Sequence, residues 1–217
     1  MLLLAVDTSG GQGGITLARG DSDGFEVIES TAIQGGTFSA ELIAQIAEVL
    51  TTHALIPEAL QGLVAVTGPG SFTGLRVGLT AIKALAEVLQ VPIATVTALE
   101  VLEAASQKGN RAMAVIDAGR GEVYLRLSRG GSVEEGLVPI TEAAELGKST
   151  GAMVVTVDAQ LASRFQNATI AQYCSSEVAG RLGLKKLLAG DTVDVLALDA
   201  NYIRKSEAEY MQKLKRE

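Results

Sequence analysis

The stretches that decide the fold read Val6-Asp7-Thr8-Ser9-Gly10-Gly11 and Ile116-Asp117-Ala118-Gly119-Arg120-Gly121. In each, an apolar run ends at an aspartate, a glycine-containing turn follows, and a second run begins. This order predicts a β-hairpin in both places. Laying one hairpin over the other without a gap also pairs Leu17 with Leu127. Hairpins can resemble each other by chance because they share composition, but the aspartate retained at the end of the first strand favours a duplication of half the chain.

Two halves that each open with strand, aspartate, turn and strand have the organisation of the actin-like, sugar-kinase and Hsp70 ATPases. We therefore predict an α/β, two-lobed, duplicated fold of the ribonuclease H-like type with a shortened second lobe. We expect the first lobe at residues 1–107, the second at residues 110–200, and a helical tail at residues 201–217 that packs back on the first lobe. In such proteins the two hairpins hold the nucleotide phosphates from opposite lobes.

Apolar periodicity places the remaining elements. In the first half it predicts strands at Leu2–Asp7, Ile15–Arg19, Phe25–Thr31, Leu63–Val66 and Ile93–Val96, and helices at Ser39–Leu50, Leu75–Leu89 and Leu99–Ser106. Thr97 and Glu100 have the spacing of a capping box for the last of these helices. In the second half it predicts strands at Ala114–Asp117, Glu122–Arg129, Ser132–Val138 and Ala152–Val157, and helices at Thr141–Leu146 and Ser176–Leu188.

The composition of the chain limits the classes of function that it can have. The chain has 217 residues, 47% hydrophobic and 20% charged, which is enough to build a substantial core. Its formal net charge of −7 argues against a large nucleic-acid interface, which needs clustered cations. The lone cysteine, Cys174, cannot form an internal disulfide, and no apolar run is long enough to span a membrane, so we expect a cytoplasmic protein. The single histidine, His53, has no ligands beside it, so we expect no metal site.

A glycine-rich turn, Gly68-Pro69-Gly70-Ser71-Phe72-Thr73-Gly74-Leu75-Arg76, joins a strand to a helix, as phosphate-binding turns do. It lacks the lysine of a phosphate loop. The second half also lacks a Gly-Gly turn before a helix that could hold adenine, since the only Gly-Gly after Asp117 is Gly130-Gly131, at a predicted hairpin end. We therefore expect an ATPase relic without catalytic residues or cofactor. Its degenerate phosphate-loop-like site comprises Asp7, Thr8, Ser9, Gly68, Gly70, Ser71, Thr73, Gly74 and Asp117. For the first three residues, a turn whose side chains bond nearby backbone is an equally good interpretation.

Wide apolar stripes run along the two long helices of the first half, and such stripes can mark a protein interface. They predict a partner interface made of Leu42, Ile46, Leu75, Arg76, Leu79 and Ile82. Packing of both stripes on the chain's own sheet is an equal alternative. For Arg76, an intramolecular salt bridge is favoured over a substrate contact, and Phe72 is expected either to fill the space beneath the glycine turn or to join the core.

The sequence resembles the bacterial TsaB (YeaZ) family of tRNA threonylcarbamoyladenosine biosynthesis. The motifs that carry the resemblance are Val6–Ser9, Gly68–Arg76, Asp117–Tyr124 and Tyr202–Arg204, so it extends along the whole chain with a weak middle. Gly68–Arg76 is the most specific of them. Departures are Phe38 where the family often has histidine, Gly119 where it has arginine, Asn201 before the last motif, and Ile203 where it has leucine.

The resemblance implies a non-catalytic scaffold or activator subunit. Such a subunit pairs through its first lobe with a TsaD-like catalytic subunit, which carries the metal and transfers a threonylcarbamoyl group to an adenosine beside the anticodon. A TsaE-like ATPase joins the larger complex, a homodimer is an alternative assembly, and tRNA is contacted only indirectly. From another class, the rival hypothesis is a small actin-like ATPase or kinase with its own nucleotide site at Asp7 and Asp117. A protease finds no ligands or base in the sequence.

Overall fold

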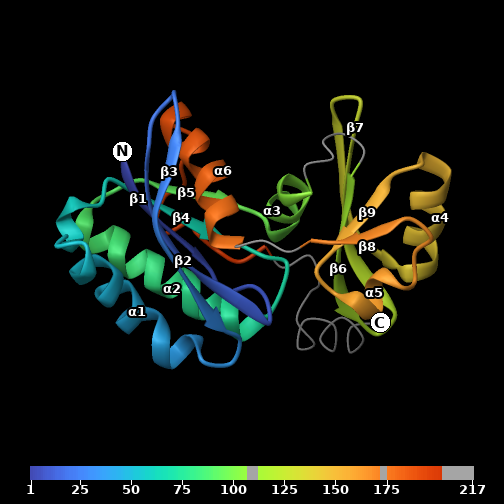
Figure 1. Cartoon of the computed structure of the whole chain (residues 1–217), viewed down its shortest axis with the longest axis horizontal. Coiled ribbons are helices and arrows are strands. Elements are labelled where there is room, and N and C mark those ends of the chain that lie inside the picture. The colour runs from blue at the N-terminus through green and yellow to red at the C-terminus, as the bar shows by residue number, and fades with distance from the viewer. Residues whose placement is uncertain (107–111, 172–174, 202–217) are drawn as a thin grey trace, which may run out of the picture.

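The computed structural model describes residues 1–106, 112–171 and 175–201, which form two five-stranded mixed sheets lying beside each other (Figure 1). The first sheet has the strand order β3-β2-β1-β4-β5, with β1 Leu2–Asp7, β2 Gln12–Gly20, β3 Phe25–Gln34, β4 Gly62–Val66 and β5 Ile93–Val96. The second has the order β10-β9-β6-β7-β8, with β6 Ala112–Gly119, β7 Glu122–Arg129, β8 Ser132–Pro139, β9 Met153–Thr156 and β10 Ala168–Ile170.

The two sheets are built on the same plan, which confirms the predicted duplicated α/β fold. In each, the first strand pairs antiparallel with the second and parallel with the strand that follows the first helix. The second half is reduced at one point in particular: where the first half has the 18-residue helix α2 (Phe72–Leu89), the second has the four-residue α5 (Ala159–Ala162). A shorter helix covers less of its sheet, so the second lobe is smaller.

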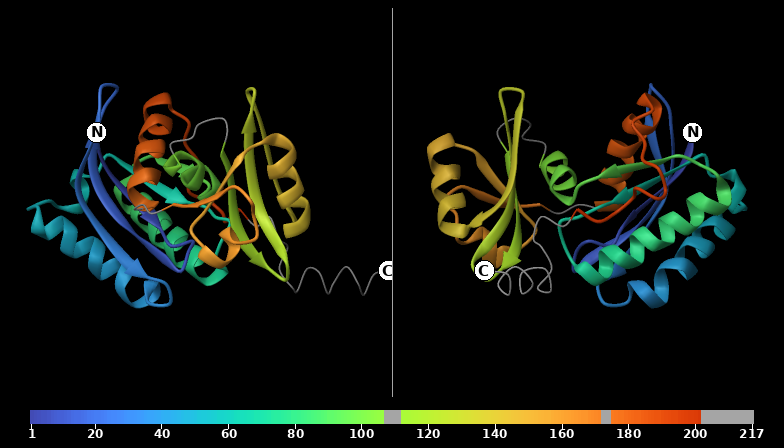
Figure 2. Two further views of the ribbon diagram at one scale, coloured as in Figure 1. Left: turned by 45° about the vertical axis from the view of Figure 1, so that its right-hand side comes forward. Right: turned by 180° about the vertical axis from the view of Figure 1, so that it is seen from behind.

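Helices cover both faces of the first sheet (Figure 2). Along β1, Leu2, Leu4 and Val6 belong to the core under α1 (Phe38–Thr52) and α2, and Leu3 and Ala5 belong to the core on the opposite face. All of β1 is buried, as expected for a central strand whose side chains alternate between two covered faces.

The opposite face is covered by α3 (Ala98–Ala105) and α6 (Ser175–Ala189). At Gly183 an added Cβ would lie 2.4 Å from the Val64 methyl groups, so a glycine is needed for α6 to approach the sheet. Although α6 lies within residues 110–200, the predicted second lobe, it packs on the first sheet. Residues 191–201 follow it there: Val193 forms a bridge with Ile93. The predicted boundary near residues 107–110 and the tail at residues 201–217 stay predictions, since Tyr202 and the residues beyond it lie outside the described ranges, as does Cys174.

Most predicted elements are present, with ends that differ by a few residues. The capping box of α3 is confirmed: Thr97 Oγ1 accepts a hydrogen bond from Glu100 N at 3.0 Å, and Glu100 Oε2 accepts one from Thr97 N at 2.6 Å. The sequence did not predict α5, β10 or the short 3-10 helix at Pro57–Ala59, because elements of three or four residues are too short to show periodicity. The helix α4 spans Ile140–Thr150 and is longer than predicted.

One ionic cluster joins the two lobes. Arg126 on β7 donates from Nε to Glu103 Oε2 on α3 at 2.7 Å and from its terminal nitrogen to Glu135 on β8. Burial by itself would lower the pKa of the Arg126 guanidinium, but hydrogen bonds to both carboxylates and their negative charge outweigh burial and raise the pKa above its ordinary value. The arginine therefore stays charged and fixes α3 against the second sheet.

Candidate functional site

The turn after β1 is buried and bonded to itself. Asp7, Thr8 and Ser9 are each less than a tenth exposed. Asp7 Oδ1 accepts hydrogen bonds from Ser9 N at 2.8 Å and from Ser9 Oγ at 2.6 Å. This is the side-chain-to-backbone turn that the sequence offered as the alternative to a metal-and-phosphate site. The aspartate thus uses one carboxylate oxygen to order its own turn.

The glycine turn lies directly against this hairpin turn. Ser71 N donates to Ser9 O at 2.6 Å. A Cβ on Gly70 would lie 2.1 Å from Ser9 O, one on Gly74 2.1 Å from Thr8 O, and one on Gly78 2.2 Å from Thr8 Oγ1. Gly70 at the end of the glycine turn and Gly74 and Gly78 on α2 thus form one row of glycines four residues apart, and this row allows the helix and the hairpin turn to touch. Gly70 and Gly74 belong to the predicted site, whereas Gly78 does not, although its spacing of four residues from Gly74 is visible in the sequence.

The other end of the glycine turn is anchored as well. The carbonyl of Gly68, which has a φ of 101°, accepts a hydrogen bond from Ala98 N at 2.7 Å. The carbonyl of Thr67 accepts one from Asn201 N at 2.7 Å. The turn therefore connects the β1–β2 hairpin, the start of α3 and the end of the described chain.

The first turn of α2 is capped internally and presents a cation. Ser71 Oγ accepts a hydrogen bond from Gly74 N at 3.2 Å, so the helix begins at Phe72, and Thr73 is exposed. The Arg76 guanidinium lies 3.8 Å from the centre of the Phe72 ring, a cation–π contact on the surface. Phe72 is 42% exposed, so it neither fills the space beneath the loop nor joins the core. Arg76 makes no salt bridge within the described part of the chain, which corrects the favoured prediction for it.

The second aspartate repeats the local geometry in a different setting. Asp117 Oδ1 accepts a hydrogen bond from Gly119 N at 2.8 Å, the counterpart of the bond between Asp7 and Ser9 N. Asp7, however, is 4% exposed, and Asp117 lies exposed at the end of β6. The structure thus brings the first hairpin turn and the glycine turn together, with Asp117 placed on the other sheet (Figure 1).

The apolar part of the predicted partner interface is wrong. Its members are at most 6% exposed and belong to the core between the first sheet and α1 and α2; they are Leu42, Ile46, Leu75, Leu79 and Ile82. Each helix turns its apolar stripe to the sheet, because β1, β2 and β4 present a matching row of large side chains. The outer face of the two helices instead exposes Ile43 at 62% and Val88 at 79%.

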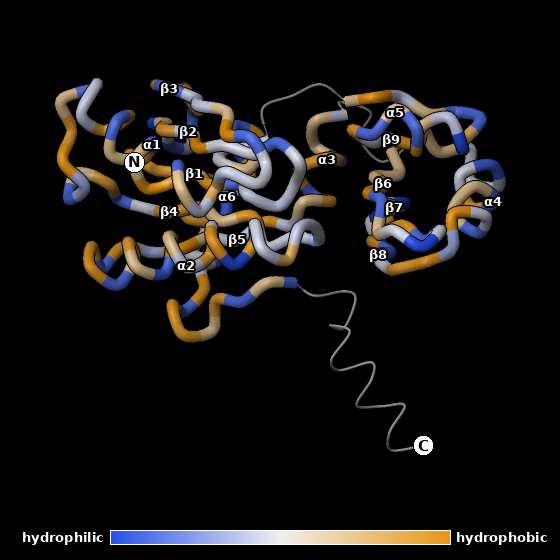
Figure 3. The backbone as a smooth tube through the Cα atoms, turned by 90° about the horizontal axis from the view of Figure 1, so that it is seen from below, coloured by the Kyte–Doolittle hydropathy of each residue, from blue (hydrophilic) through white to orange (hydrophobic). Residues whose placement is uncertain are grey.

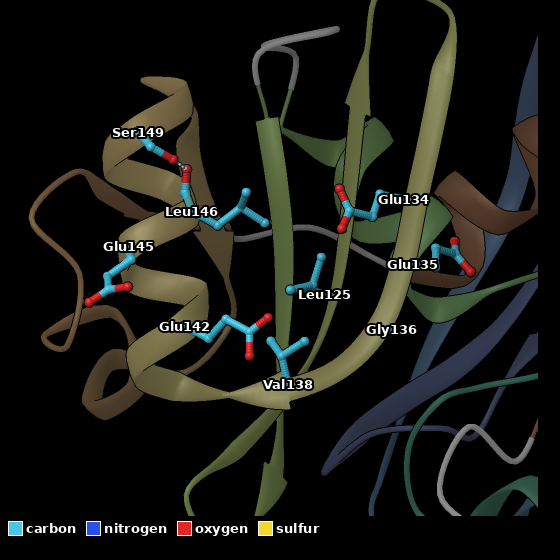
Figure 4. Close-up of a pocket in the computed structure, with 9 residues that line it drawn as sticks. All are labelled: Leu125, Glu134, Glu135, Gly136, Val138, Glu142, Glu145, Leu146 and Ser149. Carbon is cyan, nitrogen blue, oxygen red and sulfur yellow. Dashed lines mark hydrogen bonds between the residues drawn. The ribbon is translucent and has the colours of Figure 1, made fainter.

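Two cavities lie in the second lobe, away from the predicted site. The first, of about 370 Å³, lies between α4 and the β7–β8 pair, and the residues around it include Glu134, Glu135, Glu142 and Glu145 (Figure 4). The second, of about 400 Å³, lies between the C-terminal end of α4 and residues 164–167. The part of the chain that the structure describes holds no group of three or more histidine, cysteine, aspartate or glutamate residues placed to bind a metal. In the same residues, no helix is long and apolar enough to cross a membrane.

Comparison with known proteins agrees with this architecture. The family model of TsaD, tRNA N6-adenosine threonylcarbamoyltransferase, matches residues 35–144, half of the chain. The chain belongs to the TsaD family. Its curated relatives in the family include the tRNA threonylcarbamoyladenosine biosynthesis protein TsaB of Bacillus subtilis, 34% identical over 128 residues, which are 58% of this chain and 55% of the relative. The resemblance to TsaB predicted from sequence is thereby confirmed, and the chain spans about half the length, or less, of the curated relatives it matches.

Solved structures extend the likeness to the whole fold. YeaZ from Pseudomonas aeruginosa superimposes with a TM-score of 0.73 at 21% identity, over 93% of this chain and 99% of that one. The activator of 2-hydroxyisocaproyl-CoA dehydratase from Clostridium difficile, solved with bound ADPNP, superimposes with a TM-score of 0.54 at 10% identity, over 88% of this chain and 97% of that one. At these identities the likeness concerns the fold, which this TsaD-family chain shares with YeaZ and with an activator that binds a nucleotide analogue.

Proposed function

We propose that this chain is a non-catalytic scaffold or activator subunit in tRNA N6-threonylcarbamoyladenosine modification, working in the cytoplasm beside a TsaD-like catalytic subunit. The proposal rests on its TsaD family membership, on its TsaB relatives and on one structural observation. At this turn, the backbone N–H groups of Ser9, Ser71 and Gly74, which could otherwise face a phosphate, donate hydrogen bonds within the protein itself.

Those hydrogen bonds close the turn. Ser9 N donates to Asp7 Oδ1, Ser71 N to Ser9 O, and Gly74 N to Ser71 Oγ. A phosphate that used these three N–H groups would first have to break their bonds, and a buried group left unsatisfied costs about 1–3 kcal/mol. The turn thus supports an architectural role: it fixes α2 against the first hairpin.

The outer face of α1 and α2 is the partner surface that we propose in place of the buried stripes. Its exposed residues on α1 are the small or apolar Ala40, Ile43, Ala44 and Ala47 with the acidic Glu41 and Glu48 beside them, and on α2 they are mixed (Thr73, Arg76, Thr80, Ala84, Glu87, Val88). Small side chains let a partner helix approach closely, and exposed Ile43 and Val88 offer apolar area. A TsaD-like subunit would dock here, a TsaE-like ATPase would join the complex, and a homodimer would use the same face in the partner's absence. With a net charge of −7, the chain would meet tRNA only through its partners.

Binding to the TsaD-like subunit of the same organism tests the pairing. Ile43→Asp should leave the fold intact, since the side chain is 62% exposed, and should weaken the complex at least tenfold by isothermal titration calorimetry. Val133→Asp, at a 53% exposed position on the second lobe, is the matched control and should bind like the unchanged protein. Equal affinity of both variants and the unchanged chain would contradict the proposed surface.

Calorimetry with Mg-ATP separates the scaffold from the rival ATPase or kinase. The closed turn predicts no saturable binding by the isolated chain. Micromolar binding that disappears in Asp7→Ala would reject the scaffold in favour of a nucleotide site at Asp7 and Asp117.

A further inference from the structure

The cavity at the C-terminal end of α4 differs in character from every site discussed above. It measures about 400 Å³, within the usual range for small-molecule sites. One wall is the last turn of α4 with the start of β9, and the other is the segment 164–167 between α5 and β10. Val154 N donates to Asn167 O at 2.8 Å, so the two walls are joined at their base.

The interior of this cavity is apolar and its rim is polar. Ala152, Val154 and Phe165 line it and are at most 9% exposed, as members of the core of the second lobe. Gln166 and Asn167 line the rim and are exposed. An apolar floor with a few polar groups around it is the usual construction of a small-ligand pocket.

Two cations complete the lining. Lys148 comes from the last turn of α4 and Arg164 from the opposite wall. Within the described ranges neither side chain has a hydrogen bond or an ion pair, in contrast to Arg126, which is held by two glutamates. The only carboxylate in the lining is Glu145, which also lines the acidic cavity on the other side of α4 (Figure 4). The lining therefore carries a net positive charge in a chain that is negative as a whole.

We propose that this cavity binds a small organic anion, with a carboxylate or phosphate head group at Lys148 and Arg164 and a compact apolar body on Val154 and Phe165. Arginine suits such a head group because its planar fork donates two parallel hydrogen bonds. The site goes beyond the proposed scaffold role and does not depend on it, because no residue of the first lobe takes part.

Protein-observed NMR titration with phenyl phosphate tests the site. Saturable shifts confined to residues 144–154 and 164–167 are expected. Benzyl alcohol, which has a similar body and no charge, and inorganic phosphate, which is the head group alone, should each bind at least tenfold more weakly. A lack of saturation, shifts elsewhere, or equal binding of benzyl alcohol would overturn the proposal.

Variants that remove one charge from the cavity test whether affinity changes in the direction that the charges predict. Arg164→Gln and Lys148→Gln should each weaken the binding of phenyl phosphate about two- to fivefold, the range for an exposed charge contact. Glu145→Gln should strengthen it about two- to threefold, because it removes the opposing charge. Arg129→Gln, an exposed cation on β7 outside the cavity, should leave it unchanged. These positions are exposed, so folding is expected to persist; unchanged affinity in both lining-cation variants, or an equal loss in Arg129→Gln, would reject the site.

Discussion

Replacing Gly74 by alanine sets two effects of known size against each other. Alanine is the better residue inside a helix by about 1 kcal/mol, so α2 taken alone would be stabilised. The added Cβ, however, would lie 2.1 Å from the carbonyl oxygen of Thr8, which is more than 1 Å inside an ordinary contact of about 3.4 Å. That oxygen belongs to the backbone of a buried turn, so it cannot rotate away as a side chain could.

The steric clash should therefore outweigh the gain in helix propensity. Overpacking of this kind costs about 1–3 kcal/mol or more. Moving α2 outward would also lengthen the bond from Ser71 N to Ser9 O, which contributes about 1 kcal/mol. After the helix propensity gain is subtracted, Gly74→Ala should be destabilised by about 2 kcal/mol. In a chain of this size, that lowers the melting temperature by about 4–8 °C.

Urea unfolding followed by circular dichroism measures this change, and Gly147→Ala on α4 is the control. There the Cβ would lie 3.2 Å from Cε at the end of the flexible Met113 side chain and 3.3 Å from Val154 Cγ2, approaches that need shifts of only a few tenths of an ångström, so stability should change by less than about 1 kcal/mol. A Gly74→Ala variant as stable as the unchanged protein, or more so, would refute the close approach of the helix to the hairpin turn and the closed site built on it.

Three further substitutions test other parts of the structure by the same unfolding measurement. Leu79→Glu, at a 6% exposed core position, should lower the free energy of unfolding by at least about 3 kcal/mol. A variant that stayed folded and failed only to bind the partner would instead support the prediction that Leu79 lies in the partner interface. Arg126→Met should cost about 2 kcal/mol by leaving Glu103 and Glu135 without their cation, while Arg129→Met on the same strand should change stability by less than about 0.5 kcal/mol. Asp7→Ala removes two buried hydrogen bonds and should cost about 2 kcal/mol, whereas Asp117→Ala, exposed at the equivalent turn, should cost less than about 1 kcal/mol.

The fold was predictable from sequence where periodicity was long. The continuous apolar run of β1, the helical spacing in α1 and α2, and the repeated aspartate turn each specified local structure, and the repeat specified the overall plan. α5 and β10 were not predictable, because a four-residue helix and a three-residue strand contain less than one reliable period.

The sequence could show which residues form the glycine turn and the apolar helix faces, but it could not show what these residues contact. Periodicity shows which face of a helix is apolar and says nothing of what covers that face, so Leu42 and Leu79 fitted a partner interface as well as a core. The glycine turn was identified by composition, but its closure depends on the distance between Ser71 N and Ser9 O, and those residues are far apart in the sequence. The stripe of Gly70, Gly74 and Gly78 was the available indication that a second backbone lies against this helix.

Because α6 packs on the first sheet, the two duplicated halves do not form two independent lobes. Without α6, the face of the first sheet that carries Leu3, Ala5 and Val64 would lose Ala179, Leu184 and Leu187 as packing partners. A first lobe ending near residue 107 would therefore expose apolar surface that the whole chain buries, and removing it from water contributes about 25 cal/mol per Å². The halves share one plan, yet the first depends on a helix from the second, and Arg126 connects the second to α3 of the first.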